Sequence, residues 1–281
     1  MKKRIFANIA AGITAAAMIA AVGSCGSGSQ AETTAAAPEP AAADNSLQKV
    51  LDDKQLILGL DASFPPMGFT NDANEIVGFD IDVAQEVCDR MGVTLVKQPI
   101  NWDNKEEDLN VGKIDCIWNG MSINDSRKQV MNLSDPYMNN EMIFTVPKDS
   151  GITSMDDLKG KTVGVQSGSS AEEILMASDI YADITVTALE DNVTLLNQME
   201  LGFSDAVFLD SVVANYLITE NSKDYVILPG NLEAEEYAVG FRKNDQALRD
   251  EVQRILSEMK ADGKLGEIST KWFGSDITTV K

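Results

Sequence analysis

The side chains that most often carry out chemistry in proteins are sparse in this sequence. The chain of 281 residues has no histidine, which rules out a Ser-His-Asp triad, a Cys-His pair and imidazole metal sites or bases. Its three cysteines are too few for a zinc site of four cysteines. The acidic run Asp103, Glu106, Glu107 and Asp108 lacks calcium-loop spacing and fits the solvated first turn of a helix. We therefore expect no catalytic residue, no metal and no cofactor, as in a protein that binds and releases.

The charge of the chain excludes further partners. Lys and Arg total 23 against 44 Asp and Glu, a formal net charge of −21 at pH 7. Nucleic acid binding requires basic side chains that neutralise phosphates, and docking on anionic lipid requires a basic patch. We expect no nucleic acid partner. The length predicts about two domains of roughly 150 residues each.

The first residues have the pattern of an export signal. Basic residues at positions 2–4 precede an apolar run over 5–22, and small residues follow. Cys25 then stands where the bacterial lipobox, which this segment resembles, places a cysteine that becomes N-terminal and lipid-modified. Val22 replaces the usual leucine of that motif. A retained transmembrane anchor is the alternative, because the apolar run is close to bilayer length.

We expect a signal peptide over 1–24, lipid attachment at Cys25 and a disordered tether over 25–45. The tether consists mainly of Gly, Ser, Ala, Thr, Pro and Glu, a composition that buries too little apolar surface to become ordered. The protein would then be exported and held by lipid at the outer face of the cell membrane.

From about Ser46 onward, short apolar runs alternate with helical patterns. This alternation is typical of open, mostly parallel α/β sheets flanked by crossover helices. The predicted strands cover 55–60, 94–100, 114–118, 161–165, 184–189, 205–209 and 225–228. The predicted helices cover 79–91, 105–111, 171–177, 193–201, 211–219 and 246–261, and a short one reaches Trp272-Phe273.

The α/β pattern restarts near Lys161, which predicts two lobes. Extended segments at 142–147 and 237–242 are the expected crossings. Lobe 1 would take 46–142 and 237–281, and lobe 2 would take 143–236. Because ligands bind beyond the carboxyl ends of strands in such sheets, the ligand would lie in a cleft that closes by hinge motion.

An ordered set of motifs over residues 50–274 resembles the solute-binding proteins of polar amino-acid ABC importers, bacterial extracellular family 3. The resemblance implies the type II periplasmic-binding-protein fold. It also implies a free amino acid as ligand, ABC importer permease subunits as partners and a monomer. The motifs lie at 60–67, 77–82, 112–115, 121–128, 134–137, 157–165 and 271–274.

The resemblance assigns the two ends of the amino acid to different lobes. Arg127 closes the family's T-x-x-x-x-R pattern, which begins here with Ser122, and its guanidinium would bind the carboxylate as a two-pronged donor. Ser122 would add a hydroxyl and a backbone N–H. Asp210 would take the ammonium group, and it can also cap the helix that follows. A surface arginine is the alternative for Arg127. Carbonyls of Asn119 or Gly120 would supply further acceptors.

The remaining predicted contacts surround the ligand. Backbone N–H groups near Ser169 and Ser170 would bind the carboxylate at a helix N-terminus. Phe64 and Trp102 would sandwich the side chain of the ligand. Asp61 would contact the far end of that side chain and so contribute to specificity. Gln166 and Leu209 depart from the residues usual in relatives, which leaves the identity of the bound side chain open. We expect a polar one, with basic and amide types included.

Three questions stay open at this point. Trp102 and Trp118 each fit either a core or a cleft wall. Cys88 and Cys116 fit either a disulfide or two buried thiols. In place of transport, the same fold also serves exported prephenate-type dehydratases and amino-acid sensors that act through a partner.

Overall fold

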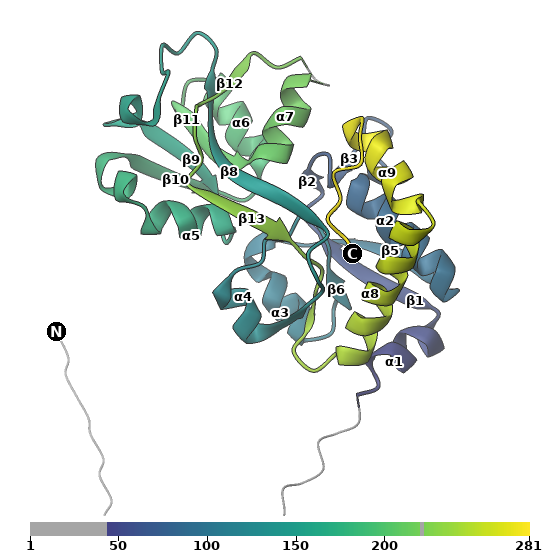
Figure 1. Cartoon of the computed structure of the whole chain (residues 1–281). Coiled ribbons are helices and arrows are strands. Elements are labelled where there is room, and N and C mark those ends of the chain that lie inside the picture. Colours follow the sequence, from purple (N-terminus) through teal and green to yellow (C-terminus); the bar gives the residue numbers. More distant parts are fainter. Residues whose placement is uncertain (1–43, 220–221) are drawn as a thin grey trace, which may run out of the picture. The chain divides into compact units, whose positions relative to one another are not determined.

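The computed structural model describes residues 44–219 and 222–281. The predicted signal peptide, Cys25 and positions 25–43 of the predicted tether lie outside the described residues. Within them the chain forms two mixed sheets with helices on their faces, and two neighbouring strands run between the sheets (Figure 1). Neither described range contains a helix long and apolar enough to cross a membrane.

The first sheet has the strand order β5-β1-β6-β14-β7. Its β1 pairs in parallel with β5 and β6, whereas β14 arrives from far along the chain and is antiparallel to β6 and β7. Both ends of the described chain therefore contribute to this lobe. The strands are β1 (Gln55–Leu60), β5 (Thr94–Pro99), β6 (Cys116–Ile117), β7 (Met131–Leu133) and β14 (Gly240–Arg242).

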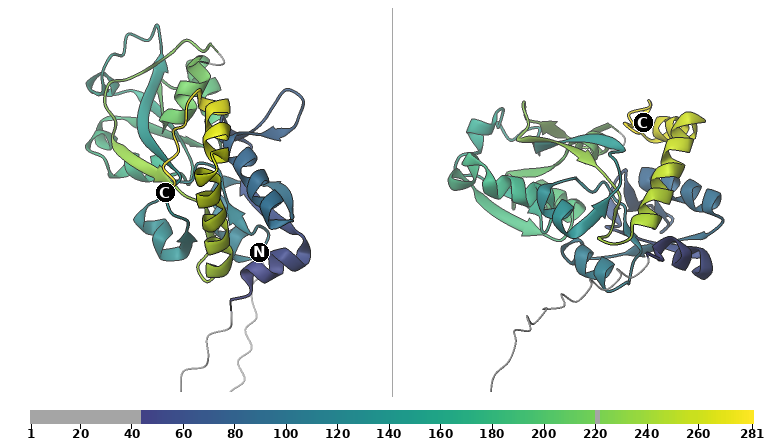
Figure 2. Two further views of the ribbon diagram at one scale, coloured as in Figure 1. Left: turned by 45° about the vertical axis from the view of Figure 1, so that its right-hand side comes forward. Right: turned by 60° about the horizontal axis from the view of Figure 1, so that its bottom comes forward.

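Helices cover this sheet, and the two C-terminal ones lie beside the two N-terminal ones (Figure 2). Buried residues of α8 recur at three- and four-residue spacing, the periodicity that predicts an amphipathic helix. A small antiparallel sheet, β2-β3-β4, lies between β1 and α2 in sequence. The elements are α1 (Ser46–Asp53), β2 (Ser63–Phe64), β3 (Gly68–Thr70), β4 (Ile76–Val77), α2 (Phe79–Met91), η1 (Trp102–Asn104), α3 (Lys105–Asn110), α4 (Asp125–Val130), α8 (Gln246–Ala261) and α9 (Lys264–Phe273).

The second sheet has the order β10-β9-β11-β8-β12, and β13 also pairs with β8. Here β9 is parallel to β10 and β11, whereas β8 is antiparallel to β11, β12 and β13. Its elements are β8 (Met138–Pro147), η2 (Met155–Leu158), β9 (Thr162–Gln166), α5 (Ser170–Ala177), η3 (Asp179–Asp183), β10 (Thr185–Leu189), α6 (Asn192–Glu200), β11 (Ala206–Asp210), α7 (Ser211–Thr219), β12 (Tyr225–Ile227) and β13 (Glu233–Tyr237).

The parallel ladders of both sheets are the ones that the alternating pattern predicts, and the antiparallel ladders come from the crossing strands. Because β8 carries the chain away from the first sheet and β13 brings it back, these neighbours run in opposite directions (Figure 1). The two-lobed α/β fold is confirmed, with sheets that are mixed. The predicted lobe boundaries fall within β8 and at the end of β13, and they stay a prediction.

The same local design positions the central strand of each lobe. Gly112 and Gly202, both with positive φ, follow α3 and α6, and an aspartate comes three residues after each glycine. The Asp115 carboxylate accepts the backbone N–H of Ile57 at 3.0 Å. The Asp205 carboxylate accepts that of Thr162 at 2.8 Å. Each aspartate thus ties the start of a central strand to its parallel neighbour, which holds the opposite, carboxyl ends in register.

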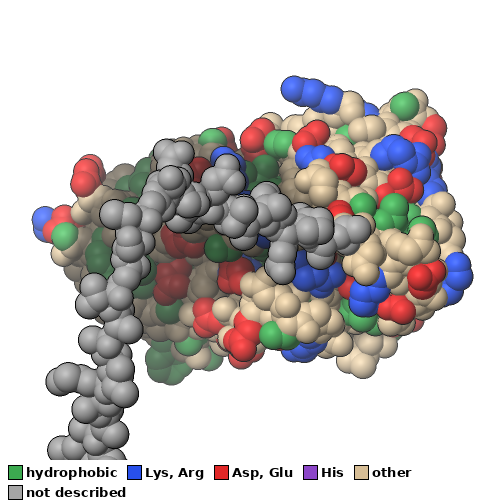
Figure 3. Space-filling model, turned by 90° about the horizontal axis from the view of Figure 1, so that it is seen from below, with side chains coloured by type: hydrophobic (Ala, Val, Ile, Leu, Met, Phe, Trp, Pro, Cys, Tyr) green, Lys and Arg blue, Asp and Glu red, His purple; other side chains and the backbone are tan. Residues whose placement is uncertain are grey.

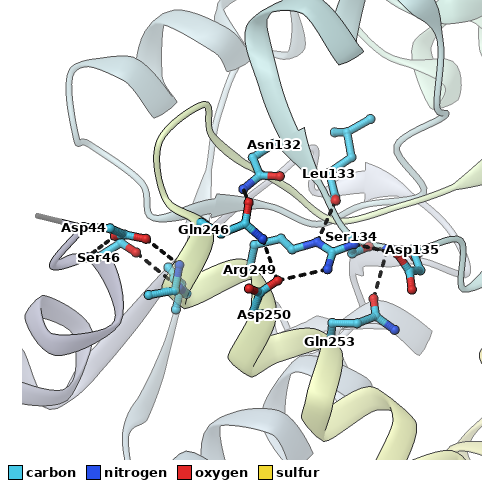
Figure 4. A network of polar contacts seen from close by, with 12 residues as sticks. Asp44, Ser46, Asn132, Leu133, Ser134, Asp135, Gln246, Arg249, Asp250 and Gln253 are labelled. Atoms are coloured by element: carbon cyan, nitrogen blue, oxygen red, sulfur yellow. Dashed lines mark hydrogen bonds and ion pairs between the residues drawn. The ribbon is translucent and has the colours of Figure 1, made fainter. Parts of the chain in front are cut away.

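Polar contacts hold α8 against the first sheet (Figure 4). The Asp44 carboxylate accepts the N–H of Ala247 at 2.5 Å, and the Ser46 hydroxyl accepts the N–H of Leu248 at 3.1 Å. These two bonds satisfy N–H groups that the first turn of a helix leaves without partners. Arg249 donates to the Leu133 carbonyl at 2.9 Å and so joins α8 to β7. The first described residues are therefore part of this lobe.

The surface in the described ranges fits the acidic composition. In the view from below, lysines and arginines are interspersed with acidic side chains on the part that the grey atoms leave uncovered (Figure 3). Many of the basic groups are paired with a nearby carboxylate, such as Lys159 with Asp183 and Lys113 with Asp108. A surface of this kind offers a poor match to polyphosphate or anionic lipid.

Cys88 and Cys116 are free thiols, both fully buried in one hydrophobic cluster. The structure thus decides between the two readings of this pair. Burial raises the pKa of Cys88 to about 12 and raises the pKa of Cys116 well above its usual value. Thiols react as thiolates, so both groups should be inert in the folded protein.

We expect a thiol reagent to find no reactive cysteine in the folded Cys25→Ser protein and two after denaturation without reductant. The reason is the combined loss of access and of thiolate in the buried cluster. The measurement is the absorbance of released thionitrobenzoate. Reaction of either cysteine within minutes under native conditions would contradict the burial of the thiols. If the denatured sample released no thionitrobenzoate, the two cysteines would be joined in a disulfide.

Candidate functional site

The eleven residues predicted to contact a ligand all line one cavity between the two lobes. Its volume is about 280 Å³, including the part open to solvent. Phe64 and Arg127 come from the first lobe, for example, and Ser170 and Asp210 from the second. The complete lining is Asp61, Phe64, Trp102, Asn119, Gly120, Ser122, Arg127, Gln166, Ser169, Ser170 and Asp210.

Strand ends place the polar members of this lining. Asp61 directly follows β1, and Asn119 comes two residues after β6. Gln166 and Asp210 are the last residues of β9 and β11. Because these strands are parallel within each lobe, their carboxyl ends meet at one edge of each sheet and the two edges face each other.

Arg127 is the buried cation of the site. It lies in α4, where the Asn124 side chain caps the helix by accepting the Arg127 N–H at 2.8 Å. The residue is 2% exposed, and its Nη1 donates to the Ser122 carbonyl at 2.6 Å. Its Nε has no hydrogen-bond partner among the described residues. Burial lowers the pKa of this guanidinium, and nearby carboxylates oppose that effect. A buried cation with an unused donor is suited to an anionic ligand group.

Asp210 is the buried anion across the cavity. Its Oδ1 accepts from Tyr237 Oη at 2.5 Å and from Asn140 Nδ2 at 2.7 Å. Burial raises the pKa of Asp210 to about 7, and Glu235 adds to the rise, while Arg127 lowers it. A cation in the cavity would relieve this penalty.

Asp61 and Gln166 form a bridge between the lobes. Gln166 Nε2 donates to Asp61 Oδ2 at 2.8 Å, and its Oε1 accepts from Asn192 at 3.1 Å. Asp61 Oδ1 accepts the Ser63 N–H at 2.8 Å. Burial raises the pKa of Asp61 to about 6. One cavity wall is therefore a carboxylate and an amide that are already oriented.

Aromatic rings form other walls of the cavity. Phe64 packs against Gly120, whose φ is +56°, and a Cβ there would lie 2.8 Å from the Phe64 ring. The Gly120 N–H donates to the fully buried Asp80 at 2.7 Å, which keeps this loop in place. Trp102 both belongs to a buried cluster and lines the cavity, so both of its readings hold. Trp118 is fully buried outside the lining and is a core residue.

The turn after β9 presents a helix N-terminus to the cavity. Ser169 caps α5, since its Oγ accepts the Glu172 N–H at 3.1 Å and donates to the Gln166 carbonyl at 2.7 Å. Ser170, the first residue of α5, donates through its Oγ to Ser122 Oγ at 3.1 Å. The start of α5 carries a partial positive charge, which favours an anion next to Arg127.

The lobes are in contact around the cavity. Lys105, at the start of α3, donates to the Gly168 carbonyl at 2.9 Å. Asp103 accepts from Ser167 Oγ at 2.9 Å, and a Cβ at Gly168 would overlap Asp103. These contacts join the η1 segment of one lobe to the β9–α5 turn of the other. Asp103 thus has a partner across the cleft, and the described part of the chain holds no cluster of His, Cys, Asp and Glu fit for a metal.

The sequence patterns missed a set of residues behind the lining. Glu235, Asn140 and Tyr237 lie on β8 and β13 and contact Ser122 or Asp210. Lys105 lies behind Trp102, with its Nζ 5.4 Å from the ring centroid. The alternating burial of β13 appears only in the structure, because its sequence EAEEY has no apolar alternation that could have indicated these residues.

A protein-family model matches most of the described chain. The model of the bacterial extracellular solute-binding proteins, family 3, matches residues 56–275. The chain belongs to this family. The predicted membership is thereby confirmed, and the chain is a solute-binding protein rather than an enzyme.

Individual members of the family are similar over most of the chain. The L-cystine-binding protein TcyJ of Escherichia coli (strain K12) is 31% identical over 234 residues, 83% of this chain and 87% of that protein. The arginine-binding extracellular protein ArtP of Bacillus subtilis (strain 168) is 30% identical over 224 residues, 78% and 86% of the two chains. A substrate-binding protein of an ABC uptake transporter from Streptococcus pneumoniae, solved with bound histidine, superposes with a TM-score of 0.81 at 38% identity. That match covers 84% of this chain and 99% of the other.

Proposed function

We propose that this protein captures a free polar amino acid between its lobes and delivers it to the permease of an ABC importer. Arg127 would bind the carboxylate together with the N-terminus of α5, and Asp210 would bind the ammonium group. The relatives named for cystine, arginine and histidine support an amino acid as the ligand class.

The observation that carries the proposal is the unpartnered Nε of a guanidinium that is 2% exposed. Burying a charge and leaving a donor unused costs free energy that the fold recovers only when a ligand fills the gap. The opposite wall holds Asp210, a carboxylate without a cationic partner in direct contact among the described residues. An anion site and a cation site across a small cavity match a zwitterion.

The contacts between the lobes support hinge closure as the mode of capture. Ligand groups that touch Arg127 in one lobe and Asp210 in the other stabilise the closed arrangement and shift the population toward it. The polar bridge from Asp61 to Gln166 and the contact from Lys105 to Gly168 form only when the lobes meet.

The side chain of the amino acid would lie between Phe64 and Trp102 and reach toward Asp61. Aromatic faces attract cations and cover apolar stems, and the Asp61 carboxylate accepts hydrogen bonds. These groups favour a basic or amide side chain.

Outside the described residues, Cys25 is proposed as the lipid attachment site that holds the protein at the outer face of the cell membrane. Export agrees with the extracellular family to which the chain belongs. The tether before Asp44 would let the lobes reach a permease in the same membrane.

We expect at least one of the twenty common amino acids or cystine to raise the melting temperature. A ligand at a thousand times its Kd adds ~4 kcal/mol, which corresponds to ~10 °C for a domain of this size. The measurement is a thermal-shift screen. Arg127→Ala should lose the response, whereas the control Arg254→Ala, which changes an exposed arginine of α8, should keep it. A flat response to the whole panel would count against the proposal.

A further inference from the structure

A hydrogen-bond chain lies behind the ammonium side of the cavity and centres on Glu235. Ser122 Oγ donates to Glu235 Oε2 at 2.9 Å. Asn140 Nδ2 donates to the same oxygen at 3.4 Å and to Asp210 Oδ1 at 2.7 Å. Glu235 is 7% exposed and does not line the cavity, so it acts on the site through its neighbours.

The direction of these bonds decides what the cavity offers to a ligand. An ionised carboxylate accepts hydrogen bonds only, so the proton of the Ser122 hydroxyl points at Glu235. Ser170 Oγ donates to Ser122 Oγ at 3.1 Å and uses one of its lone pairs. The remaining lone pair of Ser122 makes it an acceptor on the cavity wall.

The same carboxylate orients Asp210. The amide of Asn140 is held at both ends, because its Oδ1 accepts from Ser211 Oγ at 3.3 Å while its Nδ2 donates to Glu235 and Asp210. With Tyr237 as second donor, Asp210 Oδ1 is fully engaged and the other oxygen is left for a cation.

We infer that Glu235 is a positioning residue that sets the polarity of the ammonium half of the site. It turns the Ser122 hydroxyl into an acceptor and, through Asn140, aims Asp210. The cavity then presents two acceptors to an ammonium group without Glu235 touching it. This inference rests on the proposed function. The strand β13, which runs between the sheets (Figure 1), carries Glu235, whose carboxylate accepts from Ser122 and Asn140.

The test compares Glu235→Ala, Glu235→Gln and the matched control Glu236→Ala, an exposed neighbour on the same strand. The probes are L-arginine, L-histidine and L-glutamine, titrated calorimetrically, and the tightest wild-type binder is carried through all variants with its deamino analogue. Glu235→Ala should weaken the amino acid ~10- to 100-fold, as expected for buried polar groups that lose a partner. Because the deamino analogue lacks the ammonium group, its binding should change far less.

Glu235→Gln should bind within ~5-fold of wild type, because its amide oxygen can still accept from Ser122 and Asn140. Asn140→Ala combined with Glu235→Ala should weaken binding less than the sum of the single changes, as members of one chain do. Wild-type affinity in Glu235→Ala, or equal losses in the Ala and Gln variants, would overturn the positioning role while leaving the proposed function intact. If none of the three probes binds to the wild type, the tightest binder of the thermal-shift panel replaces them, and a wild-type protein that binds no member of that panel would overturn both.

Discussion

Arg127→Ala should abolish amino-acid binding, with a loss of ~100-fold or more in affinity. Removing one member of a buried, hydrogen-bonded charge pair costs about 2–5 kcal/mol. Among the described residues that line the cavity, Arg127 Nε and Asn119 Nδ2 are buried donors without a partner, and only Arg127 carries the positive charge that complements a carboxylate. Isothermal titration calorimetry with the best amino acid from the thermal screen measures the loss.

Arg127→Lys separates geometry from charge. An ammonium group keeps the charge but cannot donate from a planar fork, so we expect it to stay more than ~10-fold weaker than wild type. Arg254→Ala should bind normally, since Arg254 is exposed and pairs only with carboxylates of its own helix α8, Glu251 and Glu258. Circular dichroism checks that each variant is folded. Wild-type affinity in folded Arg127→Ala would refute the assignment of the carboxylate site.

Lowering the pH from 8 to 5 should close the ligand-free protein. Closure buries Asp210, Asp61 and Glu235 without a cation, and burial raises the pKa of all three, to about 7 for Asp210 and about 6 for Asp61. An aspartate whose pKa rises on closure takes up a proton as the lobes close. The free-energy cost of burying its charge is therefore absent below the ordinary pKa of 3.8 and reaches its full value above the raised pKa. For Asp210 this cost at neutral pH is at most ~4 kcal/mol, the value for a carboxyl that is fully solvated when the lobes are open.

Small-angle scattering measures this effect as the radius of gyration. At pH 5 the ligand-free protein should approach the smaller radius of the ligand-saturated protein, whose own radius should not depend on pH. Asp210→Asn should be more closed at pH 8, because the variant buries no charge at that position, although it should bind the amino acid poorly. An unchanged radius between pH 5 and 8, or an expansion in a protein that circular dichroism shows to be folded, would contradict the prediction.

Local patterns predicted the elements well where a single helix or strand carries its own signal. The helices at 79–91, 211–219 and 246–261 have the predicted ends. In α2, acidic residues occupy the first turn, and Gly92, with φ +69°, ends the helix. Residues at the helix ends themselves therefore indicate its boundaries. Short elements such as β7 and the β2–β4 sheet were missed because two- and three-residue strands are too short to show a period-two pattern, and β7 also depends on the distant β14 as its partner.

The sequence by itself determined the family, the two-lobed α/β fold and the eleven residues around the cavity. Strand ends and the motif from Ser122 to Arg127 carry part of that information locally, and the resemblance to the family supplied the rest, including Phe64 and Trp102. Only the tertiary structure decided that the Arg127 Nε is unpartnered, that Cys88 and Cys116 are free thiols and that Glu235 reaches Ser122. Ser122 and Glu235 are 113 positions apart, and no local pattern records which side chains meet when β13 returns between the lobes. Hydrogen-bond direction, burial and the resulting pKa values depend on such distant neighbours, and they exist only once the chain has folded.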